Sequence, residues 1–380
     1  MFEEYWSVIS IFIVLVLGAF IIIKLSLYFK LSSNRGFLIY IWHTLFCFVY
    51  FFYAQTYGAD AIAYYQRAII GNFTFSFGTT AVYGLTSLLI HGLSFNLLSC
   101  FLFFNIFGSI GLLAFDSALK HATRAKSTYL KRLATIIIFL PSVSFWSSAI
   151  GKDSISFLAI GLALWASLQL NNRIWLMILA VFLMLIVRPH MAGIMVISLA
   201  VSVIFDQKIN FFKRFIFSLV AIVGSTLMIP FALQYAGVSD PSSAEGLLDY
   251  VETRQSYNMQ GGGGVDISNM NLFMQLITYM FRPFIFEAKS VTALAAAIDN
   301  LILLYLFIAG SYALIKKKTK KFTENRNFMW VYTCLAWIVL AMTTANLGIA
   351  VRQKWMFAPM LIFLLISLIG KEKKNNNLYK

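Results

Sequence analysis

Charged residues are scarce in this chain of 380 residues, because Asp, Glu, Lys and Arg together make up only 12% of it. That is about half their share in an average soluble domain. A soluble fold of this size needs a polar surface, yet 60% of the residues are hydrophobic. The three cysteines, Cys47, Cys100 and Cys334, lie inside apolar runs. The composition therefore excludes a water-soluble fold, a disordered chain, a collagen-like repeat and a disulfide scaffold.

Long apolar runs recur from one end of the chain to the other. A helix needs about 20 residues, or about 17 at the short end, to cross roughly 30 Å of hydrocarbon. On this basis we predict an all-α polytopic membrane bundle of about eleven crossings in a single integral-membrane domain, 1–380. The crossings are 5–23, 37–53, 95–114, 133–149, 155–170, 174–187, 191–205, 215–234, 292–315, 328–345 and 356–369. We expect the first to be an uncleaved helix, because no charged region precedes it and no small-residue cleavage site is evident.

Lys and Arg are unevenly distributed between the connections. If the N-terminus, with Glu3 and Glu4, faces outward, 22 of the 30 basic residues fall on the inner side and ten of the 15 acidic residues fall outside. The positive-inside rule therefore predicts an outward N-terminus and a cytoplasmic C-terminus. The net charge of +15 then reflects orientation in the membrane, so we expect no nucleic-acid partner.

Two weakly apolar segments, 78–92 and 270–286, do not fit this alternation as crossings. We expect both to lie as helices in the plane of the outer interface. The polar segment 235–269 is expected to be one long outer loop, made mobile by four consecutive glycines at 261–264. With the second interfacial helix, the predicted outer region covers 235–290.

Eight basic residues lie on the outer side, against the charge bias: Arg67, Lys152, Arg188, Arg254, Arg282, Lys289, Arg352 and Lys354. Three neighbouring crossings are short, so we expect Lys152, Asp153, Arg188 and His190 to lie below the level of the lipid headgroups. Charges at that depth are costly unless they face water or a partner. We therefore predict an outward-open cavity rimmed by cations, which binds an anion carried by a lipid such as a polyprenyl phosphate or diphosphate.

The first outer connection supplies an acid. Asp60 stands between small residues, and Tyr64 follows about one helical turn later. A carboxylate in this setting suits a base that takes a proton from a sugar hydroxyl while aromatic rings stack on the sugar. When Arg and Lys stabilise a phosphate leaving group, the remaining chemistry is alignment, and few catalytic groups are needed.

Several of these residues also have a structural interpretation. Asp60 fits a helix N-cap, and Lys152 with Asp153 fits a neutralising pair in a first helical turn. Arg188 and Arg282 each precede a proline that ends or restarts a helix, so either arginine can simply extend to the interface.

The histidines and the one acid inside a crossing leave alternatives open. His190 fits an interfacial histidine as well as a group that orients acceptor or phosphate. Asp299 either pairs with a neighbouring helix or lines the cavity. The four histidines show no metal-ligand spacing, so we expect neither a metal nor a cofactor.

Four short motifs follow one another along the chain. An outer Asp60 precedes tyrosines, a proline-bearing segment at 140–146 leads into Lys152-Asp153, Arg188-Pro189 follows a short crossing, and Arg352-x-Lys354 precedes the last crossing. This layout resembles bacterial polysaccharide polymerases and related integral-membrane glycosyltransferases of the GT-C type. The chain lacks an Asp-x-Asp or Asp-Glu pair at Asp60, which argues against a metal-dependent oligosaccharyltransferase.

The resemblance implies transfer of a glycan from an undecaprenyl-diphosphate donor to an acceptor hydroxyl, at the outer face of a bacterial cytoplasmic membrane. It implies Asp60 as catalytic base and Arg188, Arg352 and Lys354 as ligands of the diphosphate. From their positions and chemistry we add five candidate substrate-binding residues: Tyr64, Lys152, Asp153, His190 and Arg282. Partners would be the lipid-linked donor, the glycan acceptor, the membrane, and a chain-length regulator or other polysaccharide assembly proteins. An O-antigen ligase, a single-sugar transferase, a flippase or transporter of lipid-linked oligosaccharide, and a structural assembly protein remain alternatives.

Overall fold

A computed structural model describes residues 2–71, 76–205, 244–259, 263–316 and 324–370, with isolated positions between 205 and 244. Over these ranges the chain is helical, and the only pairing of extended backbone is a single antiparallel bridge between Gly264 and Asn346. The predicted all-α class is therefore confirmed for the described part of the chain.

The N-terminal half runs from α1 to α10. Its helices are α1 (Phe2–Tyr28), α2 (Ser33–Tyr57), α3 (Asp60–Ile70), α4 (Thr79–Ser87), the π-helical turn η1 (Leu88–Gly92), α5 (Leu97–Thr123), α6 (Thr128–Ile138), α7 (Pro141–Ser147), α8 (Lys152–Ser167), η2 (Leu170–Asn172), α9 (Ile174–Val187) and α10 (Pro189–Ile204). The C-terminal half contains α12 (Ala244–Met259), α13 (Leu272–Phe281), η3 (Ile285–Glu287), α14 (Val291–Lys316), α15 (Arg326–Thr343), α16 (Leu347–Gln353), η4 (Lys354–Met356) and α17 (Ala358–Leu368).

Within the described ranges, five helices are long and apolar enough to cross a membrane: α1, α2, α5, the α6–α7 segment and α14. A sixth span results if α16, η4 and α17, which are bent by 66°, count as one. Ten of the eleven predicted crossings coincide with helices, but α9 has only 14 residues and α8 and α10 have 16 each. The crossing predicted at 215–234 lies outside the described ranges. Eleven crossings and their orientation stay predictions.

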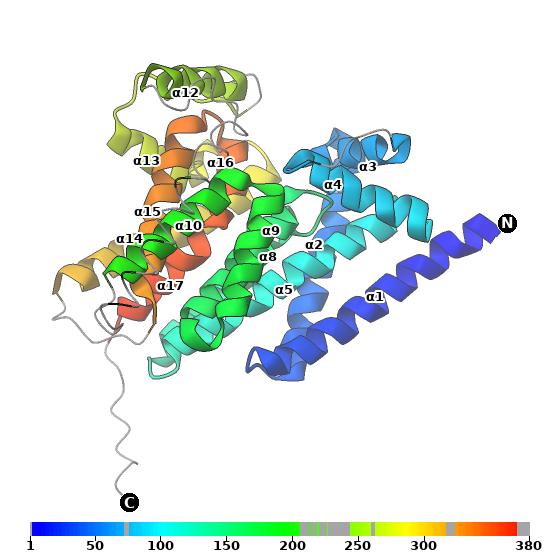
Figure 1. The fold of residues 1–380 in the computed structure, drawn as a ribbon, viewed down its shortest axis with the longest axis horizontal. Helices are drawn as coiled ribbons and strands as arrows, with labels where there is room; N and C mark the ends of the chain where they lie inside the picture. Colours follow the sequence, from blue (N-terminus) through cyan, green and yellow to red (C-terminus); the bar gives the residue numbers. More distant parts are fainter. Residues whose placement is uncertain are drawn as a thin grey trace, which may run out of the picture.

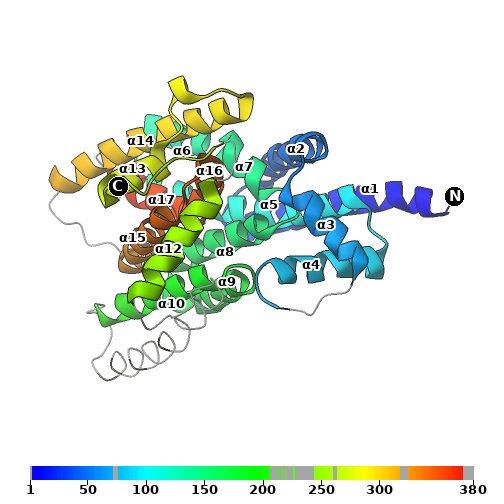
Figure 2. The same ribbon diagram turned by 90° about the horizontal axis from the view of Figure 1, so that it is seen from above.

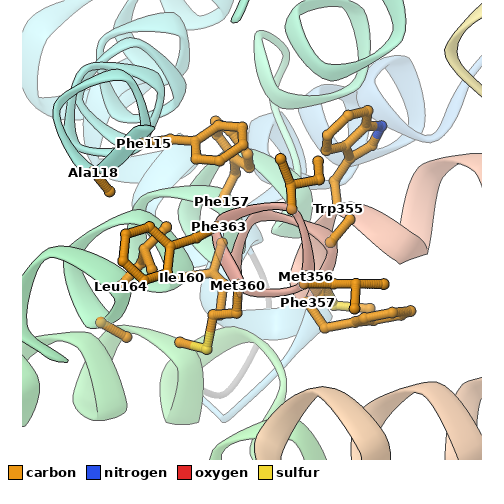
Figure 3. Packing of buried hydrophobic residues seen from close by; sticks show 14 of the residues in the cluster. Phe115, Ala118, Phe157, Ile160, Leu164, Trp355, Met356, Phe357, Met360 and Phe363 are labelled. Carbon is orange, nitrogen blue, oxygen red and sulfur yellow. The ribbon is translucent and has the colours of Figure 1, made fainter. Parts of the chain in front are cut away.

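The core of the bundle forms where α5, α8 and α17 meet. Gly111 on α5 and Gly161 on α8 face one another, and a Cβ on Gly161 would lie 2.5 Å from the Gly111 carbonyl oxygen. Small residues at such a contact let two helix backbones approach closely. Figure 3 shows Met360 and Phe363 of α17 packed among Phe115 of α5 and residues of α8.

A second apolar cluster supports the end of the bundle that carries α3 and α4. It joins side chains of α2, α3, α4, η1, α5 and α7, among them Tyr50, Tyr64, Val82 and Phe145. Figures 1 and 2 show α3 and α4 on one side of α8, and α12 with α15 on the other. The start of α8 therefore lies between two groups of helices that are far apart in the sequence.

The segment predicted as a long polar loop contains a helix, α12. Side-chain amides of Gln255 and Asn258 donate to the carbonyls of Met342 and Thr343 at the end of α15, both over 2.8 Å. This segment is polar and has no apolar stripe from which a helix could be predicted. Hydrogen bonds to the carbonyls at the end of α15 hold the helix instead. The first predicted interfacial segment is helical as α4 and η1, and the second as α13 and η3.

Candidate functional site

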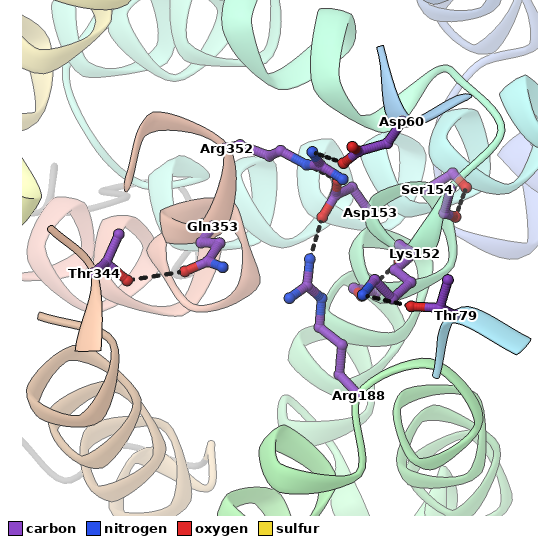
Figure 4. A network of polar contacts seen from close by, with 11 residues as sticks. Asp60, Thr79, Lys152, Asp153, Ser154, Arg188, Thr344, Arg352 and Gln353 are labelled. Carbon is purple, nitrogen blue, oxygen red and sulfur yellow. Dashed lines mark hydrogen bonds and ion pairs between the residues drawn. The ribbon is translucent and has the colours of Figure 1, made fainter. Parts of the chain in front are cut away.

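Asp153 is the centre of a cluster of charged side chains at the start of α8. It lies in the first turn of that helix, where the dipole favours a carboxylate. One of its oxygens accepts a hydrogen bond from Nη2 of Arg188 over 2.6 Å, and the other accepts from Nε of Arg352. Burial alone would raise the pKa of this carboxyl, but Arg352 and Arg188 hold it below its usual value. Asp153 is therefore an ionised carboxylate shared by two guanidinium groups (Figure 4).

Arg352 joins the two acids of the cluster. It lies in the last turn of α16, and while its Nε binds Asp153, its Nη1 donates to a carboxylate oxygen of Asp60 over 2.6 Å. Asp60 begins α3, and its side chain is 55% exposed. The guanidinium also lies 5.9 Å from the ring centre of Trp146. The planar fork of arginine suits such simultaneous contacts.

Arg188 stands at the break between α9 and α10. Pro189 begins α10, and a proline restricts the residue before it to extended backbone, so the chain turns at Arg188. The arginine is only 6% exposed, and its Nε has no hydrogen-bond partner among the described residues. Nδ1 of the nearby His190 also lacks a partner there. Buried polar atoms of this kind are costly unless a ligand or water satisfies them.

Lys152 adds a third cation, at the side of α8 that faces α4. Its ammonium donates to the hydroxyl of Thr79 over 3.1 Å. Unlike the two arginines, it has no carboxylate oxygen within 4.0 Å in the described part of the chain. Burial, and then the charge of Arg188, lowers its pKa to about 8. Lys152 therefore keeps donor capacity for an anion.

Aromatic rings form the wall of the cluster beside Asp60. Tyr64 is 7% exposed and packs edge-on against Tyr83 with ring centres 5.6 Å apart, and burial raises its pKa to about 12. Tyr50 of α2 lies 5.7 Å from Trp146, ring centre to ring centre. Tyr50, Trp146 and Thr79 were not among the site residues predicted from the sequence. Only the proximity of Trp146 to Lys152-Asp153 along the chain hinted at one of them.

The structure does not bring Lys354 or Arg282 into this cluster. Lys354 is fully buried, and its ammonium donates to Oδ1 of Asn300 on α14 and to the carbonyl of Met280, the latter over 3.5 Å. Arg282 binds Glu287 locally, with Nη2 and Oε1 2.7 Å apart. Arg352 and Lys354 are thus two residues apart yet point to different parts of the molecule.

Asp299 pairs with a neighbouring helix, which was one of its two predicted alternatives. Its carboxylate accepts hydrogen bonds from the backbone N–H of Ser142, over 3.1 Å, and from the Ser142 hydroxyl. Trp355, next to Lys354, donates to that hydroxyl over 3.2 Å. These contacts, with those of Lys354, anchor the bend after α16 and so fix the helix that presents Arg352.

Taken together, Lys152, Arg188 and Arg352 face Asp60 and Asp153 in one cluster with one net positive charge. No group of three or more His, Cys, Asp or Glu side chains suited to a metal occurs in the described ranges. The arrangement can hold an anion with several phosphate oxygens, and it places a carboxylate beside that anion. No protein-family model, curated protein or solved structure matched the chain.

Proposed function

We propose that this protein is a membrane glycosyltransferase that transfers or polymerises glycan units from a polyprenyl-diphosphate donor. The observation that carries the proposal is the convergence of Lys152, Arg188 and Arg352 around Asp153, with a buried Arg188 Nε and a Lys152 ammonium that retain donor capacity. A diphosphate attached to a lipid brings the oxygens that such donors bind, at the depth where a membrane enzyme meets it.

The proposed reaction is a direct displacement. The oxygen of an acceptor hydroxyl attacks the anomeric carbon, the bond from that carbon to the phosphate oxygen breaks, and the lipid diphosphate leaves with the bonding electrons. Lys152 and Arg188 stabilise the charge that develops on the leaving group. Arg352 exchanges Asp60 for a phosphate oxygen, and the freed Asp60 accepts the hydroxyl proton.

Reconstitution with lipid-linked repeat units tests this proposal. Purified protein is incubated with the repeat units, and the products are separated by size. A ladder of longer glycans supports a polymerase, and transfer to a different acceptor supports a ligase. Movement across the bilayer without a new bond would identify a flippase or transporter and overturn the proposed chemistry.

A matched pair of arginine variants ties the reaction to the cluster. Arg352→Ala removes the guanidinium that contacts Asp60 and Asp153, so we expect transfer to fall by at least about a hundredfold. Arg67→Ala removes an exposed arginine from the last turn of α3 and should leave transfer unchanged. Equal activity of the two variants, at equal yields of folded protein, would contradict the assignment.

A further inference from the structure

An apolar groove of about 530 Å³ lies between α4, η1, α5, α8 and α9. Its wall is almost entirely apolar and includes Leu85, Phe107, Ile155, Leu158, Leu183 and Ile186. The volume is typical of a pocket that holds a small molecule or part of a larger one.

Three residues that line the groove stand close in the sequence to the cation cluster. Ile155 stands one helical turn after Lys152 on α8, and Ile186 stands two positions before Arg188 on α9. Ala81 follows Thr79, the hydrogen-bond partner of Lys152, by two positions. The two cations with free donor capacity are therefore close along the chain to residues that line the apolar groove.

The wall formed by α4 and η1 is joined to α9 by a backbone hydrogen bond. The N–H of Gly78 donates to the carbonyl of Ile186 over 2.6 Å, which fixes the start of α4 against α9. Seven of the twelve residues that line the groove come from α4 and the π-helical turn, and Leu88 on that turn is 70% exposed. π-Helical turns inside α-helices are frequent at functional sites. Figure 2 shows α4 and α9 side by side, with α8 next to them.

We propose that this groove binds the first isoprene units of the polyprenyl chain whose diphosphate is held by Lys152 and Arg188. The inference rests on the proposed function and adds the path of the lipid. A polyprenyl diphosphate joins an anion to one linear chain of apolar isoprene units. The cluster and the groove offer the same two chemistries, and they share the start of α8, the end of α9 and the start of α4.

Binding measurements on the full-length protein in phospholipid nanodiscs test the groove. The probes are inorganic diphosphate, which has no chain, and farnesyl diphosphate, which has a short isoprenoid chain. Leu158→Trp fills the groove from α8 and Leu183→Trp narrows it from α9, while Val16→Trp adds the same ring on a 68% exposed position of α1. Thermal melting identifies any variant that fails to fold. If one of the two groove variants fails to fold, the other alone is sufficient for the test.

We expect the groove variants to bind farnesyl diphosphate at least about tenfold more weakly, because each carbon kept out of an apolar site lowers the affinity. Inorganic diphosphate should bind them within about twofold of the parent. Val16→Trp should match the parent with both probes. Folded groove variants that bind farnesyl diphosphate normally would overturn the inference.

Two further measurements separate the possible failures. A diazirine-bearing phospholipid that labels 81–92 and is not displaced by farnesyl diphosphate would show that bulk lipid occupies the groove, and the inference would be wrong. Lys152→Ala should weaken both probes. If Lys152→Ala binds both normally while the groove variants lose farnesyl diphosphate, the groove assignment stands and the diphosphate site of the proposed function fails.

Discussion

Arg352 donates a hydrogen bond from Nε to Asp153, although 199 positions separate the two residues in the sequence. The contact joins the last turn of α16 to the first turn of α8, and Arg188 binds the other oxygen of the same carboxylate. One buried acid thus determines where two cations from distant segments lie. Substrate phosphates would compete with this carboxylate for the arginines.

Asp153→Ala is expected to destabilise the fold strongly. Removal of the carboxylate leaves the 6% exposed Arg188 without its compensating charge, and Arg352 keeps only the half-exposed Asp60. Breaking a buried ion pair from one side costs about 3–5 kcal/mol. Thermal melting in detergent measures the change. Asp60→Ala is the control: its side chain is 55% exposed, so its loss should cost no more than about 1 kcal/mol. Equal melting of the two variants would show that Asp153 is not the anchor of the cluster.

The sequence allowed the convergence of these charges to be predicted, but not their partners. We expect cations that occur against the charge bias at helix junctions to share an environment, and Lys152, Arg188 and Arg352 do, whereas Arg282 and Lys354 lie elsewhere. Sequence spacing contains no information on which acid faces which base across helices. For that reason the sequence suggests Asp60 as a base but does not predict its contact with Arg352.

Lys354 shows a second limit. On a helix, residues two positions apart point to different sides, so Arg352 and Lys354 cannot share one ligand without a break between them. The sequence groups them because both lie in the short outer connection between the last two predicted crossings. They lie apart because the backbone stays helical from α16 into the 3₁₀ turn that begins at Lys354, and a seven-residue helix is too short to show a reliable periodicity.

Arg352→Lys should therefore weaken binding of the lipid diphosphate, whereas Lys354→Met should lower the stability of the fold. Arg352→Lys loses the fork that contacts two carboxylates, and we expect affinity for the lipid diphosphate to fall about tenfold. Lys354→Met leaves Asn300 without its buried partner, so it should cost about 1–3 kcal/mol of stability and change the affinity by less than about threefold. Melting and binding are measured on the same preparations. A folded Lys354→Met protein that has lost the affinity would show that Lys354 reaches the substrate.

Gly161→Ala tests the close contact between α5 and α8. The added Cβ would lie 2.5 Å from the Gly111 carbonyl oxygen, and backbone atoms on both sides must move to admit it. Overpacking of this kind costs about 1–3 kcal/mol. Gly92→Ala is a matched control for stability, since a Cβ there meets nothing within 4 Å. Melting temperatures of both variants are compared with the parent, and an unchanged value for Gly161→Ala would mean that the helices are not packed so closely.

The charge of Lys152 should set an alkaline limit on donor binding. Burial and the charge of Arg188 lower its pKa to about 8, so the ammonium is charged below that pH and neutral above it. A neutral amine holds a phosphate less well, and affinity for the lipid diphosphate should fall as the pH rises through about 8. Lys152→Arg keeps its charge because the guanidinium pKa exceeds about 12, so its binding should persist to higher pH. Affinity measured between pH 6 and 10 for both proteins decides the matter. Superimposed profiles would assign the alkaline limit to another group, whereas a displaced profile for the arginine variant makes the lysine part of the diphosphate site.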